Sequence, residues 1–228
     1  MDGELRIVDD VPLAFSTLVL AAYASSAPMR GGRPFRLVAS GGSSGAACFG
    51  AVATSGLELS DVELYFADER CVDVTTPDSN QFAIGAVFGA ARERLAGFFP
   101  MSCVDGASRY EQRLKDAGRL DLIQLGLGPD GHTASLFPNS RALDLPADQL
   151  VAINTDPSGT NVHDRMTLTY GGIALGALVI VTVIGSARAK VVRAIVDGAD
   201  YPASRLHAAR VIWLVDTAAA SLLEGDIP

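Results

Sequence analysis

Short apolar runs bounded by turn residues alternate along the chain with longer segments whose apolar residues recur at helical spacing. The apolar runs predict buried strands at residues 35–39, 62–67, 120–125, 178–184 and 211–215. The longer segments predict helices at residues 11–25, 44–55, 79–95, 108–117 and 187–196. Because strands that alternate with helices form parallel sheets covered on both faces, we expect a three-layer α/β fold with a mostly parallel sheet.

Length and composition favour a single globular domain over residues 1–228. Apolar residues make up 49% of the chain and charged residues 19%, and we see no repeat, low-complexity tract or long linker. The apolar run at 173–184 is too short to cross a bilayer, which takes roughly 20 residues. The first ten residues lack the basic and apolar regions of a secretory signal. We therefore expect a cytoplasmic protein that does not associate with membranes.

The cysteines and the net charge narrow the classes of partner. Cys48, Cys71 and Cys103 are odd in number and form no C-x-x-C pair, which predicts reduced thiols and no metal site. The net charge of −8 argues against nucleic acid as a partner. A small anionic substrate stays compatible with this charge if local cations and backbone N–H groups bind it.

The segment 125–138, LGLGPDGHTASLFP, is the strongest candidate for chemistry. It follows a predicted buried strand and places Asp130 and His132 two residues apart among glycines, where a backbone approaches a ligand closely. A histidine in such a loop can act as a base near neutral pH, although a structural histidine satisfied by the backbone is the plainer interpretation.

The same segment also matches the dinucleotide pattern G-x-G-x-x-G. Pro129 interrupts the turn, however, and Pro138 leaves no room for the long helix that a dinucleotide fold requires after the glycines. We therefore expect no nicotinamide cofactor, and no other cofactor is implied.

A second candidate is the glycine-rich loop between the first core strand and the helix predicted at 44–55. Gly41, Gly42 and Ser43 would expose successive N–H groups at a helix N-terminus, which favours a bound phosphate; capping of the helix by serine is the plainer interpretation. Gly41, Ser43 and Gly45 also match G-x-S-x-G, the nucleophile elbow of serine hydrolases. That alternative is weaker, because little sheet precedes the loop and no H-G-G-G segment is present.

Charged residues at other predicted strand ends complete the candidate set. Asp68 and Arg70 follow the strand at 62–67, at the edge where parallel sheets bind ligands. Arg70 can bind a phosphate or carboxylate with two hydrogen bonds, although a surface ion pair explains the same residues. Arg165 and Lys190 are further candidate cations, which carry weight only beside the other sites.

Together these segments resemble the 6-phosphogluconolactonase family over most of the chain. The matching segments are residues 40–43, 68–70 with 78–80, 125–138, 165–169, 185 with 190, 202–206, and Trp213 with Asp216. The resemblance implies a Rossmann-like fold similar to glucosamine-6-phosphate deaminase and ribose-5-phosphate isomerase. It also implies hydrolysis of 6-phospho-D-glucono-1,5-lactone in the oxidative pentose phosphate pathway, without metal or cofactor. We expect a monomer or a small homo-oligomer.

Glucosamine-6-phosphate deaminase is the nearest rival family. It resembles this chain in the Gly-x-Asp-Gly-His core, but its pattern continues Ile-Ala-Phe-Asn-Glu-Pro, whereas this chain continues with residues 133–138, TASLFP. The deaminase pattern also has Asp-Glu-Tyr where this chain has Asp-Glu-Arg at 68–70. Both departures favour the lactonase.

The expected mechanism needs no covalent intermediate. His132 would deprotonate a water that attacks the lactone carbonyl, and Asp130 would orient the site. The predicted substrate and phosphate contacts are Gly41, Gly42, Ser43, Asp68, Arg70, Gly131, Arg165 and Lys190. Two other classes remain open, a serine hydrolase acting through Ser43 and a binding module for sugar phosphates without activity.

Overall fold

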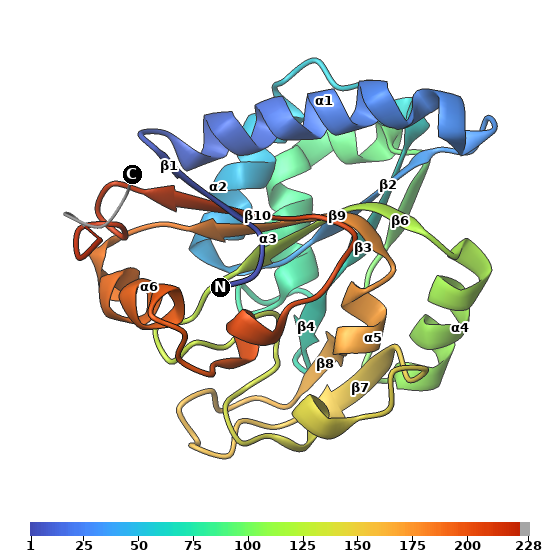
Figure 1. Ribbon diagram of the computed structural model, residues 1–228. Helices are drawn as coiled ribbons and strands as arrows, with labels where there is room; N and C mark the ends of the chain where they lie inside the picture. Colours follow the sequence, from blue (N-terminus) through green and yellow to red (C-terminus); the bar gives the residue numbers. More distant parts are fainter. Residues whose placement is uncertain (224–228) are drawn as a thin grey trace.

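A seven-stranded parallel sheet forms the centre of the molecule, in a computed structural model that describes residues 1–223 (Figure 1). The strand order is β1-β10-β9-β6-β2-β3-β5. The strands are β1 (Glu4–Val8), β2 (Phe35–Ala39), β3 (Val62–Phe66), β5 (Gly97–Phe99), β6 (Leu120–Gly126), β9 (Gly176–Val183) and β10 (Val211–Asp216). Apolar side chains of both faces are buried in one hydrophobic core, as expected for a parallel sheet between two layers of helices.

Helices cover both faces of this sheet. One layer contains α1 (Val11–Arg30), α2 (Gly42–Ala53) and α3 (Asn80–Phe88), and the other contains α4 (Ala107–Ala117), α5 (Tyr170–Ile173) and α6 (Ala189–Val196) (Figure 1). Short 3₁₀ turns occupy Leu59–Asp61, Gly89–Arg94, Arg141–Asp144, Ser186–Arg188 and Pro202–Arg205. The predicted three-layer α/β fold is confirmed.

The direction of the chain changes between two neighbouring strands. After β2 the chain runs through α2 and α3 on one face, while the elements after β6 lie on the opposite face. Because β2 and β6 are paired in the sheet, their carboxyl ends open into a crevice where the chain diverges, the usual ligand site of such sheets.

A second, smaller sheet lies beside this crevice and was not predicted. It pairs β4 (Asp68–Arg70) with β8 (Arg165–Leu168) and β8 with β7 (Val151–Asn154), all antiparallel. Each strand has three or four residues, too few for a hydrophobic period to be recognised.

Most predicted element bounds lie within about two residues of the observed ones, with two exceptions. The helix predicted at 11–25 continues to Arg30. The helix predicted at 79–95 ends at Phe88, because Gly89 adopts φ +51° and the chain continues as a 3₁₀ turn. The two edge strands of the sheet, β1 and β5, were missed. The residues of β1 are half-buried or exposed and include Glu4 and Arg6, and β5 has three residues, all half-buried.

The prediction of three reduced thiols is wrong for two of them. Cys71 and Cys103 form a disulfide, and Cys48 is free and buried. The two bonded cysteines are 32 residues apart in sequence. The fold brings together the end of β4 and the turn before α4, which spacing alone does not reveal. The disulfide removes the argument from reduced thiols for a cytoplasmic location.

Candidate active site

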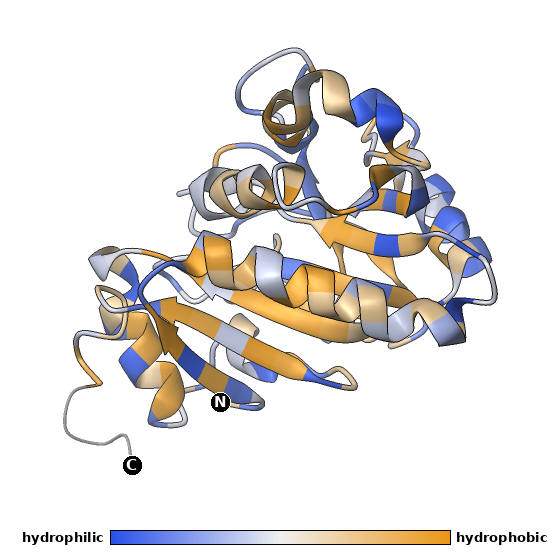
Figure 2. Cartoon of the chain, turned by 90° about the horizontal axis from the view of Figure 1, so that it is seen from above, coloured by the Kyte–Doolittle hydropathy of each residue, from blue (hydrophilic) through white to orange (hydrophobic). Residues whose placement is uncertain are grey.

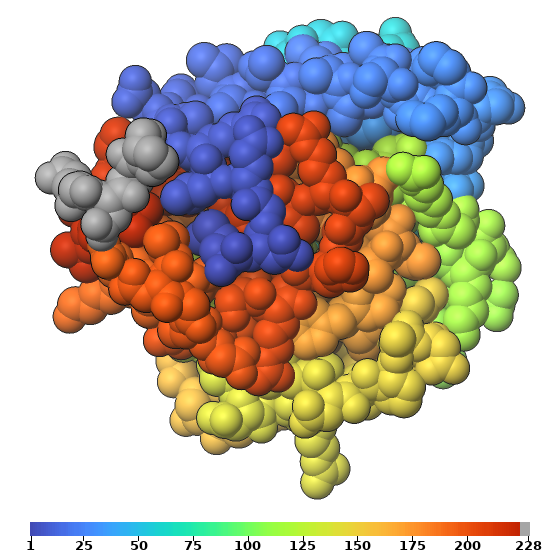
Figure 3. All heavy atoms as spheres, in the orientation of Figure 1, coloured from blue at the N-terminus to red at the C-terminus, as the bar shows by residue number. Residues whose placement is uncertain are grey.

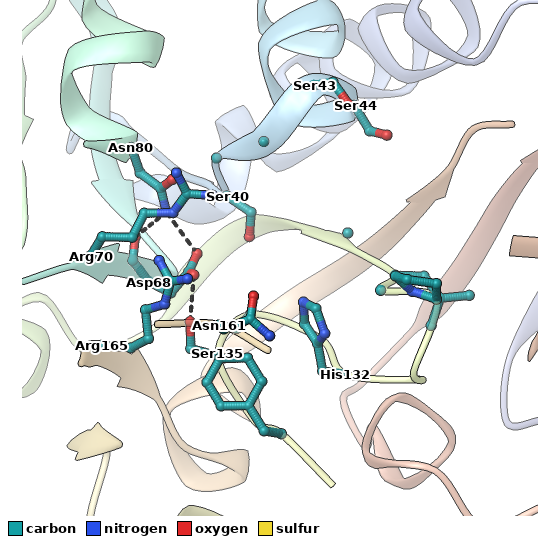
Figure 4. A pocket seen from close by; sticks show the side chains of 18 of the residues that line it. Ser40, Ser43, Ser44, Asp68, Arg70, Asn80, His132, Ser135, Asn161 and Arg165 are labelled. Carbon is teal, nitrogen blue, oxygen red and sulfur yellow. Dashed lines mark hydrogen bonds between the residues drawn. The ribbon is translucent and has the colours of Figure 1, made fainter. Parts of the chain in front are cut away.

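A cavity of about 220 Å³ opens at the carboxyl ends of β2 and β6. Two loops and the small sheet line it. The loops are the glycine-rich loop before α2 and the histidine loop after β6. In Figure 4, Ser43 and Ser44 lie at one end of this space, His132 lies across from them, and Arg70, Asp68 and Arg165 group along a third side. The crevice predicted by the topology is therefore a polar cavity.

The N-terminus of α2 faces this cavity without a cap. Gly41 is the N-cap residue, and no side chain among residues 1–223 accepts a hydrogen bond from the first turn of the helix. Gly42 adopts φ +76°, a left-handed conformation that favours glycine. A Cβ at Gly41 would lie 1.9 Å from Asn80 Oδ1, so a larger residue does not fit there. The open N–H groups and the helix dipole favour an anion.

Buried hydrogen bonds hold this loop in place from below. Ser40 N–H donates to Gln124 Oε1 at 3.0 Å, and Ser40 Oγ donates to the Gln124 carbonyl at 3.1 Å. Gln124 Nε2 in turn donates to Thr182 Oγ1 at 2.8 Å. Because all three residues are buried, these bonds fix the loop of β2 to β6 and β9 and preorganise the end of α2.

His132 is held by its neighbour Asp130. Their Nδ1 and Oδ1 atoms lie 2.5 Å apart, and the His132 backbone N–H also donates to Asp130 Oδ1 at 3.3 Å. Burial opposes ionisation of Asp130, but the hydrogen bond and charge of His132 outweigh it and lower the pKa of Asp130. An ionised Asp130 accepts the proton on Nδ1, which leaves Nε2 of His132 as the basic nitrogen.

Two glycines allow the histidine loop to take this shape. A Cβ at Gly128 would lie 2.2 Å from His132 Nδ1, and one at Gly131 would lie 2.2 Å from Tyr201 Cδ1. Gly131 also has φ +83°. Thr133 Oγ1 donates to the Gly126 carbonyl at 2.8 Å and closes the loop. The glycines of this segment therefore serve the close packing around His132 rather than a dinucleotide.

Two arginines of the small sheet lie side by side without a salt bridge. Arg70 and Arg165 are partners in the β4–β8 register, and both line the cavity. Arg165 is 6% exposed, and its Nε and Nη1 atoms have no hydrogen-bond partner among the described residues. Burial, together with the charge of Arg70, lowers the pKa of Arg165. Arg70 is half-buried, and its Nη1 donates to the Asp78 carbonyl at 2.7 Å. A buried cation without partners is costly, so the orphaned atoms of Arg165 favour an anion in the cavity.

Asp68 is oriented by two hydrogen bonds on the same side of the cavity. Ser135 Oγ donates to Asp68 Oδ2 at 2.7 Å, and Asn80 Nδ2 donates to Oδ1 at 3.2 Å. Asp68 is 8% exposed and lines the cavity. Its neighbour Glu69 is buried too, but it points to the start of α3 and accepts hydrogen bonds from that helix.

Most of the predicted site residues meet in this cavity. Gly41, Gly42, Ser43, Asp68, Arg70, His132 and Arg165 line it, with Asp130 behind the histidine. Two predicted contacts lie elsewhere: Gly131 packs on Tyr201, and Lys190 is exposed on α6. Arg188 lines the cavity in place of Lys190. Asn80, Ser135 and Asn161 also line it and were not singled out.

The missed arginine had a signal in the sequence. Arg188 and Lys190 are both basic and both follow Gly185, but a 3₁₀ turn at Ser186–Arg188 directs Arg188 back, where its Nε donates to the Leu127 carbonyl at 3.4 Å. The sequence therefore predicts a basic residue for the cavity within residues 186–190. It does not predict the 3₁₀ turn that places Arg188, and not Lys190, at the cavity. No group of three metal-ligating side chains occurs in the part of the chain that the structure describes.

A family model described as glucosamine-6-phosphate isomerases/6-phosphogluconolactonase matches residues 13–213. The chain belongs to this family. A 6-phosphogluconolactonase of a Nostoc species is 30% identical over 208 residues, which cover 83% of this chain and 85% of the relative. The human GDH/6PGL endoplasmic bifunctional protein is 32% identical over 204 residues. Those residues cover 80% of this chain but 25% of that larger protein.

Solved structures of the family share the fold. The 6-phosphogluconolactonase of Trypanosoma brucei superposes with a TM-score of 0.79 at 22% identity, covering 97% of this chain and 99% of the other. The Thermotoga maritima 6-phosphogluconolactonase gives the same score at 22% identity, covering 93% and 99%. A monomeric glucosamine-6-phosphate deaminase gives 0.75 at 19% identity, covering 96% and 99%. The fold is therefore common to both branches of the family and does not choose between them.

Proposed function

We propose that this protein hydrolyses 6-phospho-D-glucono-1,5-lactone to 6-phosphogluconate, with His132 as the general base. The observation that carries the proposal is the 2.5 Å contact between Asp130 Oδ1 and His132 Nδ1, at the edge of a cavity that also contains the partly unpaired Arg165 and an open helix end. The relatives named 6-phosphogluconolactonase support the same substrate.

The phosphate fits the cationic parts of the cavity. The N–H groups at Gly42 and Ser43 provide donors at the start of α2, and Arg70 and Arg165 provide charge. We place Arg188 among these cations instead of Lys190, because Arg188 lines the cavity. These local charges bind an anion despite the net charge of −8.

The chemistry then requires one base and one water. Nε2 of His132 takes a proton from water as the water oxygen bonds to the lactone carbonyl carbon, which leaves an oxyanion on the carbonyl oxygen. When the oxyanion collapses, the bond from that carbon to the ring oxygen breaks, and His132 returns its proton to the ring oxygen. Asp130 stabilises the transient imidazolium and fixes the ring. Backbone N–H groups of the glycine loops supply oxyanion donors.

The deaminase branch is disfavoured by the residues after the histidine. A ring-opening histidine in the deaminase pattern is supported by a glutamate, and residues 133–138 of this chain contain none. Phe137 stands where that pattern has the glutamate, and its ring lies 5.2 Å from that of His132. Ser135, two residues earlier, donates to Asp68 at 2.7 Å.

The serine-hydrolase alternative finds little support in the geometry. Ser43 lies in the first turn of α2, and among the described residues no hydrogen bond joins it to His132. A serine nucleophile needs such a base within about 3 Å.

One assay separates the three classes: disappearance of the lactone, corrected for its spontaneous hydrolysis, in wild type, His132→Ala and Ser43→Ala. We expect His132→Ala to lower kcat about 10² to 10⁴-fold while binding of 6-phosphogluconate persists. Ser43→Ala keeps turnover, and no serine-directed phosphonate labels the protein. His207→Ala, which removes a side chain that is 87% exposed, is the matched control.

Each result that contradicts the proposal identifies a different class of protein or a different base. Full activity in His132→Ala excludes the proposed base. Loss of activity in Ser43→Ala together with phosphonate labelling identifies a serine hydrolase. Binding of 6-phosphogluconate without any acceleration in wild type identifies a binding module. A rise in KM at constant kcat in Arg70→Ala would show that this arginine binds substrate and transition state equally.

A further inference from the structure

The helical layer formed by α1, α2 and α3 carries almost no charge. Arg30 is the single charged residue in these three helices, and it is 8% exposed and paired with Asp61 at 2.8 Å. By contrast, α4 alone carries five charged residues in 11. Figure 2 looks down on α1, which is orange and pale over most of its length. An uncharged outer layer is unusual for a helix that faces water.

One ridge of α1 concentrates this apolar surface. Every fourth residue from Leu13 to Met29 is exposed, namely Leu13, Thr17, Ala21, Ser25 and Met29. Leu13 is 61% exposed and Met29 71% exposed. Residues four apart form one of the ridges by which helices pack together. The ridge is symmetric in size about Ala21, with a large apolar side chain at each end and small residues between.

An apolar groove runs beside the carboxyl half of this helix. It has a volume of about 370 Å³ and lies between α1 and the amino ends of β6, β9 and β10. Leu18, Ala22 and Leu178 contribute apolar walls. The charged lining is three arginines and one aspartate, Arg33, Arg119, Arg210 and Asp121, and Asp121 pairs with Arg33 at 2.6 Å. Arg119 is exposed and forms no ion pair with any described residue.

The two ends of α1 carry opposite charges. Asp9 and Asp10 are exposed just before the helix begins, four and three residues ahead of the exposed Leu13. Arg33 and Arg119 lie by the groove at the other end. An apolar side chain preceded by two acids is the chemical complement of an apolar groove edged by arginines, so the surface is complementary to itself when turned end to end.

We propose that a second copy of this chain docks on α1, with the two α1 helices antiparallel about a two-fold axis at Ala21. The small residues at the centre of the ridge let the helices approach closely. Leu13 of each copy then enters the groove beside Met29 of the other, and Asp9 lies near Arg33 and Arg119. Because the axis makes the two contacts identical, every favourable pair occurs twice.

The size of the surface fits a modest dimer. With about 1.5 Å per residue, α1 presents a ridge about 30 Å long. A stable interface buries about 800 Å² on each partner, so the flanks of α1 must contribute. The groove lies on one flank and the uncharged outer face of α2 on the other. Figure 3 shows the blue atoms of α1 along one side of the molecule, in the open.

A membrane is the other occupant that an apolar helix invites. By length and composition alone α1 would pass as a membrane span. A helix that lies on a membrane carries Lys and Arg on its polar face, whereas α1 has a single buried arginine. The net charge of −8 also repels anionic lipid. A second copy carries the same net charge, but it offers arginines of its own to the acids before α1, which a lipid surface does not.

The proposed interface leaves the active site open. The groove lies at the amino ends of the strands and the cavity at their carboxyl ends, on opposite edges of the sheet. Loss of the dimer should therefore leave turnover per chain unchanged, which keeps this inference separable from the proposed function.

The test is sedimentation velocity from about 1 to about 100 µM, a range suited to modest affinities. We expect wild type to shift from monomer to dimer with concentration. Ala21→Glu places two carboxylates at the axis and should weaken the dimer at least tenfold, with kcat unchanged. Val104→Glu adds the same charge at a side chain that is 99% exposed elsewhere, and should dimerise like wild type.

A second variant locates the axis. Ala21→Cys should form a disulfide-linked dimer under mild oxidation, since Cys48 is buried and Cys71 and Cys103 are already bonded. Val104→Cys is the control and should stay monomeric on a denaturing gel. Three results overturn the proposal: a monomer at every concentration, a dimer equally strong in Ala21→Glu, or binding of wild type but not Ala21→Glu to phosphatidylcholine vesicles.

Discussion

The N-termini of α2 and α3 lie side by side at one edge of the sheet, but side chains cap only that of α3. At α3, Glu69 accepts hydrogen bonds from the N–H groups of Asn80 and Gln81 at 2.7 and 2.8 Å, and Ser79 caps Phe82. At α2, no side chain caps the first turn. Both ends point toward the same region, so the sequence closes one and leaves the other for a ligand.

The difference separates structural acids from functional ones in a single tripeptide. Asp68, Glu69 and Arg70 are consecutive, and their side chains alternate across β4. Asp68 and Arg70 face the cavity, while Glu69 fills the end of α3. The tripeptide looks like one charged cluster in the sequence, but its side chains have two roles. Asp68 and Arg70 belong to the cavity, and Glu69 caps α3.

Opening the closed end should have the largest effect. Glu69→Ala leaves the N–H groups of Asn80 and Gln81 and the hydroxyl of Ser79 without their acceptor in a buried setting. We expect the free energy of unfolding to fall by about 3 to 5 kcal/mol, measured by urea denaturation. Glu93→Ala, at an exposed position, should change it by less than about 0.5 kcal/mol. Equal effects at both positions would contradict the structural role of Glu69.

A carboxylate at the open end of α2 should stabilise the fold but weaken substrate binding. Ser43→Asp puts a carboxylate in the first turn of α2, where the helix dipole favours it, so stability should rise by about 0.5 kcal/mol. The same charge repels the substrate phosphate, and we expect KM to rise about 100-fold, a loss of about 2.7 kcal/mol of binding. Ser43→Asn, similar in size but neutral, should keep KM within about threefold. Unchanged KM in Ser43→Asp would move the phosphate away from α2.

The comparison also shows which parts of the site the sequence could predict. The open end of α2 and the pair Asp130–His132 were predictable, because glycines next to polar residues within one loop signal a site without reference to distant residues. The same holds for the five inner strands of the parallel sheet, which are apolar runs, but not for the edge strands β1 and β5.

The parts of the site that the sequence does not predict depend on contacts between segments far apart in sequence. The pairing of Arg70 with Arg165 arises in a sheet of three- and four-residue strands, which carry no period. The acceptor role of Glu69 requires α3 to begin above it, and the Cys71–Cys103 bond requires β4 to end near the turn before α4. Each of these is a tertiary contact, and no local pattern specifies it.

Removing Arg165 should, like closing the end of α2, weaken substrate binding without destabilising the protein, but with a smaller rise in KM. Arg165→Met removes a buried cation whose Nε and Nη1 lack partners, so the ligand-free protein should gain about 1 kcal/mol of stability. Substrate loses a charged contact, and we expect KM to rise about tenfold. Arg205→Met, at a surface ion pair with Asp200, should alter both by little. A less stable Arg165→Met with normal KM would make this arginine a structural residue.

The smallest effect is a slope in the pH dependence of stability. Burial raises the pKa of Glu69 above its ordinary value of 4.5, although backbone N–H groups of Gln81 and Asn80 act in the opposite direction. Between the unfolded and folded pKa values the native state therefore binds more protons than the unfolded state, so the free energy of unfolding falls as pH rises through that window. Glu69→Gln cannot ionise and should lack this slope.

Urea denaturation of wild type and Glu69→Gln from about pH 4 to about pH 8 checks the sign. Other titrating groups contribute equally to both proteins, so the difference between the two curves isolates Glu69. We expect wild type to lose stability relative to Glu69→Gln as pH rises above 4.5. A relative gain would mean that the donors at the end of α3 outweigh burial, and that the closed helix end attracts its anion as strongly as the open one attracts phosphate.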